Sequence, residues 1–96
     1  MERRTERLFR INDEISALRR DEHLAFEELI MLGHLDDDAQ RDAGVSGSPL
    51  DAQDARETVG DVVRMRRHVA DLRSAREHLE YKRNRMLEKF SVSAAD

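Results

Sequence analysis

Mostly apolar residues recur at alternating intervals of three and four along both halves of the chain. This spacing constrains the fold more than any other feature. In the first half the series is Leu8, Ile11, Ile15, Leu18, Glu22, Ala25, Leu29 and Leu32. In the second half it is Ala55, Thr58, Val62, Met65, Val69, Leu72, Arg76, Leu79, Arg83, Met86 and Phe90. Residues spaced in this way occupy the a and d positions of a heptad repeat on one face of a helix. We therefore predict two helices that pack along these positions, which we call the seam.

Glycine, serine and proline cluster once, at residues 44–49 between the two heptad series. Gly44 is suited to the left-handed conformation that ends many helices, with Val45 making the apolar contact that often accompanies such an end. Ser48 is suited to cap the next helix and Pro49 to its first position, where no backbone N–H is needed. Asp51 would then lie in the first turn, near the positive end of the helix dipole.

The cluster predicts one domain over residues 1–96, with helices at about 3–43 and 49–90, a turn at 44–48 and a frayed tail at 91–96. A connection this short makes the helices antiparallel neighbours. An alternative ends the first helix at Gly33 and leaves 34–48 as a loop. About half of the 96 residues are Ala, Glu, Lys, Leu or Arg, a composition typical of long helices. The predicted fold is all-α: a long antiparallel coiled-coil hairpin of two helices.

Two helices bury only one seam, which is little against the conformational entropy of an ordered chain of this length. We therefore expect self-association into a homodimer or higher oligomer, with a four-helix bundle as its form. Large apolar residues outside the seam supply a candidate interface. They are Leu24, Phe26, Ile30, Met31, Leu35, Val59 and Val63.

Glu22 interrupts the apolar seam, and polar residues at such positions commonly fix the register of the helices. For a turn centred near residue 46, Glu22 lies level with residues 69 and 70. Arg66 or Arg73 could then reach its carboxylate. We predict that these residues form a register-setting ion pair rather than a catalytic one.

Composition and motifs argue against several function classes. The chain has no cysteine and no Gly-rich phosphate loop, and its four histidines lie off the seam without a metal-binding repeat. We expect no enzymatic activity, cofactor or metal. A net charge of −4 opposes nucleic-acid binding, and no apolar run approaches the roughly 20 residues of a membrane span. The expected location is the cytoplasm.

The expected function is that of a non-enzymatic adaptor, scaffold or regulatory subunit that binds itself and another protein. One alternative comes from the acidic segment Asp36, Asp37 and Asp38 near the turn. A coiled-coil hairpin with an acidic tip resembles the coiled-coil module of the Gre-type and DksA-type factors, which enter the secondary channel of bacterial RNA polymerase. The resemblance implies RNA polymerase as partner and these three carboxylates as residues acting near its magnesium.

Overall fold

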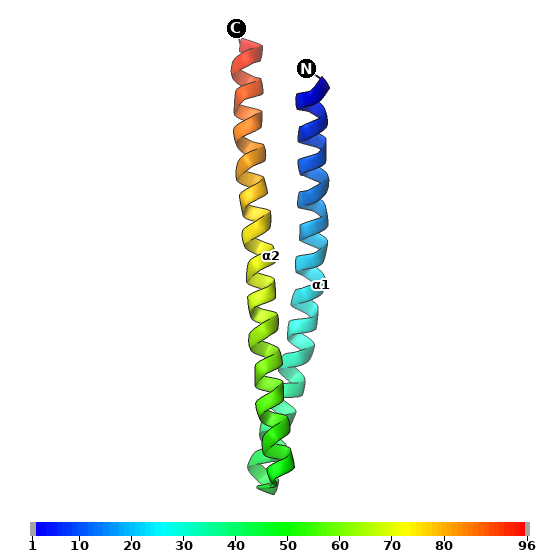
Figure 1. The fold of residues 1–96 in the computed structure, drawn as a ribbon, viewed down its shortest axis with the longest axis vertical. Helices are drawn as coiled ribbons and strands as arrows, with labels where there is room; N and C mark the ends of the chain where they lie inside the picture. The colour runs from blue at the N-terminus through cyan, green and yellow to red at the C-terminus, as the bar shows by residue number, and fades with distance from the viewer. Residues whose placement is uncertain (1, 96) are drawn as a thin grey trace. The chain divides into compact units, whose positions relative to one another are not determined.

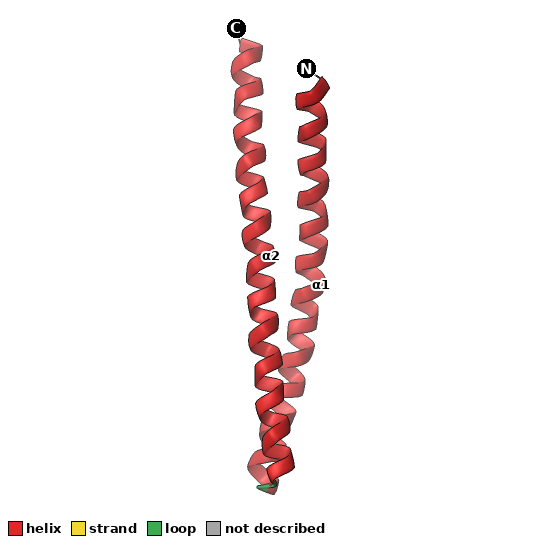
Figure 2. Ribbon diagram, viewed as in Figure 1, coloured by secondary structure: helices red, strands yellow, loops and turns green. Residues whose placement is uncertain are grey.

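The computed structural model describes the backbone of residues 2–95 and the side chains of residues 3–91. It contains two helices, α1 (Glu2–Ser46) and α2 (Pro49–Ala95), and no strand within the described residues. Figures 1 and 2 show the helices and the short loop between them. The predicted all-α class is confirmed, and the chain is a helical hairpin.

Both helices are longer than the sequence predicted. α1 continues through Gly33, so the alternative with a break there is wrong. It also passes the predicted end at residue 43 and continues to Ser46. α2 continues through residues 91–95, where we expected a frayed tail, and residue 96 lies outside the described residues. No proline follows Pro49, and Ala94 and Ala95 are strong helix formers, so nothing in this segment ends the helix.

The turn is formed by Gly47 rather than Gly44. Gly47 has a φ of 64°, and its N–H donates to the carbonyl of Ala43 at 3.1 Å. This is the left-handed helix end that we had assigned to Gly44, which instead lies inside α1. Val45 is 86% exposed, so the predicted apolar contact of this residue is also wrong.

Two serines fix the start of α2. The hydroxyl of Ser48 accepts hydrogen bonds from the N–H groups of Leu50 and Asp51, at 3.2 and 3.4 Å. The hydroxyl of Ser46 accepts the N–H of Ser48 at 3.1 Å and donates to Asp51 at 2.5 Å. The predicted cap at Ser48 and first helical residue at Pro49 are confirmed. This loop makes α1 and α2 antiparallel on its two sides (Figure 1).

The chain divides into two compact units. The terminal unit consists of residues 1–22 and 71–96, and the turn unit of residues 23–70. Each unit therefore contains a segment of α1 packed against a segment of α2.

The seam forms the core of each unit. In the terminal unit Ile11 and Ile15 are buried, and in the turn unit Ala25, Ala55, Val62 and Val69 are. Every other residue of the two heptad series is half-buried, which confirms the predicted seam. None of the described side chains carrying charge is fully buried. Neither helix offers, among the described residues, an apolar stretch that could cross a bilayer.

Candidate interaction surfaces

The seven predicted interface residues all belong to the turn unit, and all are exposed. Their exposed fractions run from 44% for Val59 to 64% for Met31. Heptad positions divide them between two sides of the hairpin, whereas we had predicted one surface. Phe26, Ile30, Val59 and Val63 occupy e and b positions; Leu24, Met31 and Leu35 occupy c and g positions. In an antiparallel pair the e and b positions of both helices share one side, and the c and g positions share the other.

We call the side with e and b positions the neutral side, because over residues 3–91 its charges nearly balance: four arginines, Arg19, Arg56, Arg66 and Arg73, against three carboxylates, Asp37, Glu77 and Glu80. In the turn unit it continues toward the loop as a shallow groove of about 370 Å³. The groove is lined by Gln40, Ala43, Ala52, Ala55, Arg56 and Val59. Three of these residues are alanines, so the groove has room for larger side chains from outside. In the terminal unit the e and b positions hold two more exposed apolar residues, Phe9 and Leu87.

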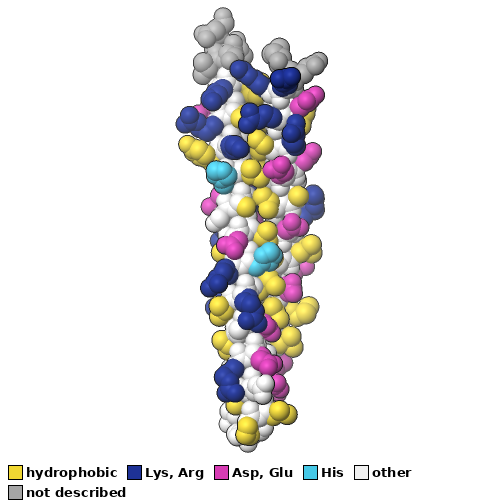
Figure 3. Space-filling model, in the orientation of Figure 1, with side chains coloured by type: hydrophobic (Ala, Val, Ile, Leu, Met, Phe, Trp, Pro, Cys, Tyr) yellow, Lys and Arg dark blue, Asp and Glu magenta, His cyan; other side chains and the backbone are white. Residues whose placement is uncertain are grey.

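We call the side with c and g positions the charged side. In the turn unit it holds a groove of about 330 Å³ next to Leu35 and Thr58. Its carboxylates are Asp38, Asp42, Asp51, Asp54, Glu57 and Asp61. In the terminal unit the c and g positions hold cations at Arg3, Arg7, Arg10, Lys82, Arg85 and Lys89. In Figure 3, Lys and Arg side chains gather toward the upper end of the view.

Glu22 belongs to an ion network within the terminal unit. Its carboxylate accepts two hydrogen bonds from Arg76, from Nε at 2.6 Å and from Nη2 at 3.2 Å. Arg73, one of the two predicted partners, reaches the same carboxylate at 3.3 Å. The other, Arg66, is exposed and lies in the turn unit. The principal partner, Arg76, was not predicted, although it is itself a seam residue.

Arg76 was not predicted as the partner of Glu22 because the turn was placed too early in the chain. The loop is centred between residues 47 and 48, not at 46, which moves the residue that faces Glu22 about three positions further along α2. The contact therefore passes from residues 69 and 70 to residues 73 and 76.

Arg76 also binds a second carboxylate. Its Nη1 lies 2.6 Å from Oε1 of Glu80, which Arg19 on α1 approaches at 3.6 Å. The hydrogen bond from Arg76 is the main cause that lowers the pKa of Glu22, while partial burial of that carboxyl opposes the shift. The same guanidinium lowers the pKa of Glu80. In return, the two carboxylates raise the pKa of Arg76. The network is thus ionised at neutral pH.

A second polar contact crosses the seam in the turn unit. The hydroxyl of Thr58 donates to Oδ1 of Asp36 at 2.8 Å, and Gln40 donates to the same oxygen at 3.0 Å. Gln40 also reaches the carbonyl of Ala55 on α2 at 2.9 Å. The sequence carried a signal for this contact that we did not use. The spacing of the first heptad series continues past Leu32 to residues 36, 39 and 43, which makes Asp36 a seam residue.

The three acidic residues of the alternative hypothesis lie away from the loop. Asp36 is half-buried in the contact with Thr58, and Asp38 forms an ion pair with Arg41 at 3.2 Å. Asp37 is exposed. Ser46 follows Asp36 by ten positions, which corresponds to about 15 Å along a helix. The residues that form the end of the hairpin are those around Gly47.

One histidine contacts a carboxylate of its own helix. Nε2 of His23 lies 3.0 Å from Oε1 of Glu27, one turn further along α1. Within the described part of the chain, no group of three or more His, Asp or Glu residues could hold a metal ion.

Comparisons with known proteins add no constraint to these surfaces. No protein-family model, curated protein or solved structure matches the chain.

Proposed function

We propose that this protein is a non-enzymatic helical hairpin that works through protein–protein contact, and that its neutral side binds the neutral side of a second copy. The observation that carries this proposal is the exposure of Phe26, Ile30, Val59 and Val63 on that side of the turn unit. Between 44% and 49% of the surface of each of these residues remains exposed.

The turn unit has little other means of burying apolar surface. Its most buried residues are two alanines and two valines, while larger side chains of the same unit remain outside the seam. Burial stabilises in proportion to apolar area, at roughly 25 cal/mol per Å². Covering the exposed halves of Phe26 and Ile30 therefore adds stabilisation that the seam alone does not supply.

A second copy is a suitable occupant because the neutral side is self-complementary. It carries projecting side chains, such as Phe26 and Ile30, and it carries the alanine-lined groove next to Val59. In a two-fold symmetric dimer each copy offers both, so each contact forms twice. Two hairpins joined in this way make the four-helix bundle that we propose.

This assembly would act in the cytoplasm as an adaptor, scaffold or regulatory subunit, leaving its outer surfaces free for another protein. The arrangement supports such a role because the ion networks hold the helices together and leave most charged side chains exposed. The partner's chemistry would be set by those exposed charges.

The proposal is tested by the native mass of the full chain, measured by light scattering in about 0.5 M salt, where contacts between exposed charges are screened. The wild type should be a dimer or larger. Phe26→Gln with Ile30→Gln should be a folded monomer. The matched control is Leu24→Gln with Met31→Gln, which removes two large apolar residues, 61% and 64% exposed, from the charged side. Its mass should equal that of the wild type.

Two results would contradict the proposal. One is a monomeric wild type across the micromolar range. The other is a Phe26 and Ile30 variant that retains the wild-type mass, because the copies would then meet on another surface.

A further inference from the structure

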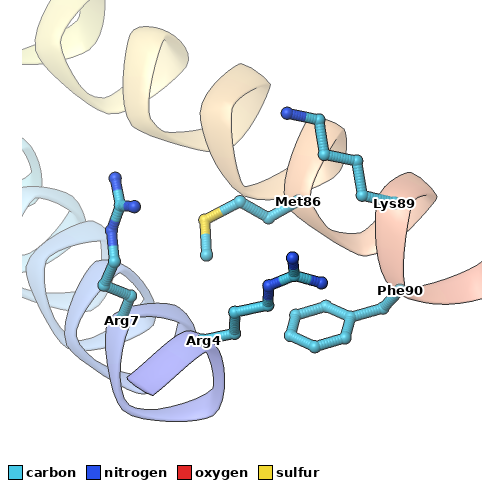
Figure 4. Close-up of a pocket in the computed structure, with 5 residues that line it drawn as sticks. All are labelled: Arg4, Arg7, Met86, Lys89 and Phe90. Carbon is cyan, nitrogen blue, oxygen red and sulfur yellow. The ribbon is translucent and has the colours of Figure 1, made fainter. Parts of the chain in front are cut away.

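The terminal unit contains a basic pocket with an apolar wall. The pocket has a volume of about 250 Å³ and is lined by Arg4, Arg7, Met86, Lys89 and Phe90. Figure 4 shows Arg4 and Arg7 projecting from α1, with the Arg4 side chain extended toward the Phe90 ring and Met86 projecting from α2. The pocket therefore combines three cations with a thioether and an aromatic ring.

None of these cations has an anionic partner in the part of the chain that the structure describes. Among the described residues, the Lys and Arg side chains that form ion pairs are Arg19, Arg41, Arg64, Arg73 and Arg76, and they do not include Arg4, Arg7 or Lys89. A lining of this kind is suited to carboxylates carried beside apolar groups. The cations would bind the carboxylates, and Met86 and Phe90 would contact the apolar atoms.

The acidic groove of the turn unit has the complementary composition. Six carboxylates line it together with Leu35, which is 53% exposed. Among the described residues Asp42 and Asp54 form no ion pair or hydrogen bond through their carboxylates, so they are available to a cation from outside. Over residues 34–61 the chain carries eight carboxylates and two arginines. The groove is thus strongly negative.

The two surfaces contain residues at the same heptad position. Arg7 and Lys89 occupy g positions in the terminal unit, and Asp42 and Asp54 occupy g positions in the turn unit. We propose that the basic pocket in the terminal unit of one copy binds the acidic groove in the turn unit of another copy. The pocket and the groove thereby form a second contact between copies, distinct from the contact of the neutral sides.

This inference deepens the proposed self-association and rests on it for the identity of the partner, a second copy. The charged contact differs from the neutral contact in its residues and in the interaction that stabilises it. The neutral contact depends on apolar burial and is insensitive to salt, whereas the charged contact weakens as salt screens the exposed ions. Salt and substitution therefore separate the two contacts.

The test uses full-length chains that carry Phe26→Gln and Ile30→Gln, so that the neutral contact is removed without a change of charge. Onto this background we place two sets of reversals. The pocket-reversed chain has Arg7→Glu with Lys89→Glu, and the groove-reversed chain has Asp42→Lys with Asp54→Lys. A third chain, with Arg20→Glu and Arg67→Glu, repeats the charge change of the first at exposed f positions.

Association is measured by sedimentation equilibrium in about 50 mM salt, after circular dichroism has shown equal helix content. The background chain should associate, and raising the salt to about 0.5 M should weaken it by at least about tenfold. Each reversed chain alone should be at least about tenfold weaker, and the control should match the background. A mixture of the two reversed chains should recover the background affinity to within about threefold, because each then meets the opposite charge.

Three outcomes would overturn the inference. Reversed chains that associate like the background, or a mixture that does not recover, would show that the pocket and the groove do not meet. A background chain that stays monomeric in 50 mM salt would show that the charged side makes no contact between copies. In each case the wild-type mass in 0.5 M salt still reports the neutral contact, so failure of this inference is distinguished from failure of the proposed function.

Discussion

The two units follow one heptad pattern and use it differently. The terminal unit places large aliphatic residues in its seam, with Ile15 only 2% exposed, and joins its helices further through the ion network around Arg76. The turn unit buries alanine and valine, and leaves residues as large as Phe26, Ile30 and Met31 outside the seam.

The difference shows how a hairpin can divide its apolar residues between folding and binding. In the terminal unit most of the large apolar side chains contribute to the seam. In the turn unit the buried seam residues are alanines and valines, while Leu29, Leu32 and Met65 of the seam are half-buried. The large side chains outside the seam remain available to a partner. Substitutions that act on one unit and not the other test this division.

The largest effect is expected from a charge in the terminal seam. Ile15→Asp places a carboxylate where the native side chain is 2% exposed, and should cost more than about 4 kcal/mol of the free energy of unfolding. Thermal unfolding followed by circular dichroism measures this loss. Tyr81→Asp, at a position 63% exposed in the same unit, should change stability by less than about 0.5 kcal/mol. Equal effects of the two would contradict the assignment of the seam.

The next largest effect is a loss of folding stability at acidic pH. Arg76 lowers the pKa of Glu22 and of Glu80 below the ordinary carboxyl value of 4.5. Folding therefore favours the ionised forms, and their contribution is fully present above about pH 5 and is lost as the pH falls through the lowered pKa values. Melting temperatures from pH 7 to pH 2 should show the wild type more stable than Glu22→Gln with Glu80→Gln at neutral pH. The difference should disappear in acid, and a constant difference would contradict this reading.

A third experiment separates register from stability in the same network. Replacing Glu22 and Arg76 together by leucine removes a partly buried ion pair and adds apolar surface to the seam, a change that is often neutral or stabilising. The melting temperature should be unchanged or up to about 5 °C higher. Without the polar pair, native mass spectrometry should detect additional oligomeric states. A variant with the same oligomeric states as the wild type would show that register is fixed elsewhere.

The smallest effects concern two glycines of the turn unit. Gly33 lies inside α1 with open space around its Cα, so Gly33→Ala should raise stability by about 0.5–1 kcal/mol. Gly47 has a φ of +64°, and Gly47→Ala should lower stability by about 1 kcal/mol. Chemical denaturation of the two variants measures both changes. Changes of the same sign would contradict the placement of the helix end at Gly47.

The seam and the helical class could be predicted from the sequence because both follow from the spacing of the apolar residues that are buried. The sequence did not place the turn, because Gly44 and Gly47 both satisfy the requirement for a left-handed helix end. The choice depends on the two serine hydroxyls around Pro49, whose contacts exist only once the loop has closed. A shift of the turn by one or two residues then changes every cross-helix pairing, as Arg76 shows for Glu22.

The interaction surfaces were predicted in part. The exposed apolar residues could be identified because they fall outside the a and d positions. Their division between two sides needed the e, b, c and g positions to be considered as well. The basic pocket was not predicted, although the hairpin register places Arg4 close to the level of Phe90.

The loop between the helices has only two residues, Gly47 and Ser48, and therefore fixes how the seam positions of the two helices face each other. This restricts which insertions and deletions the hairpin can accept. An insertion of one residue in either helix would rotate everything beyond it by about 100° and turn the seam away from its partner. An insertion or deletion that preserves the seam must therefore contain seven residues, one heptad. It must occur in both helices, at positions that face each other. Related hairpins that keep this seam should differ in length by about fourteen residues or its multiples, with the two helices changing together.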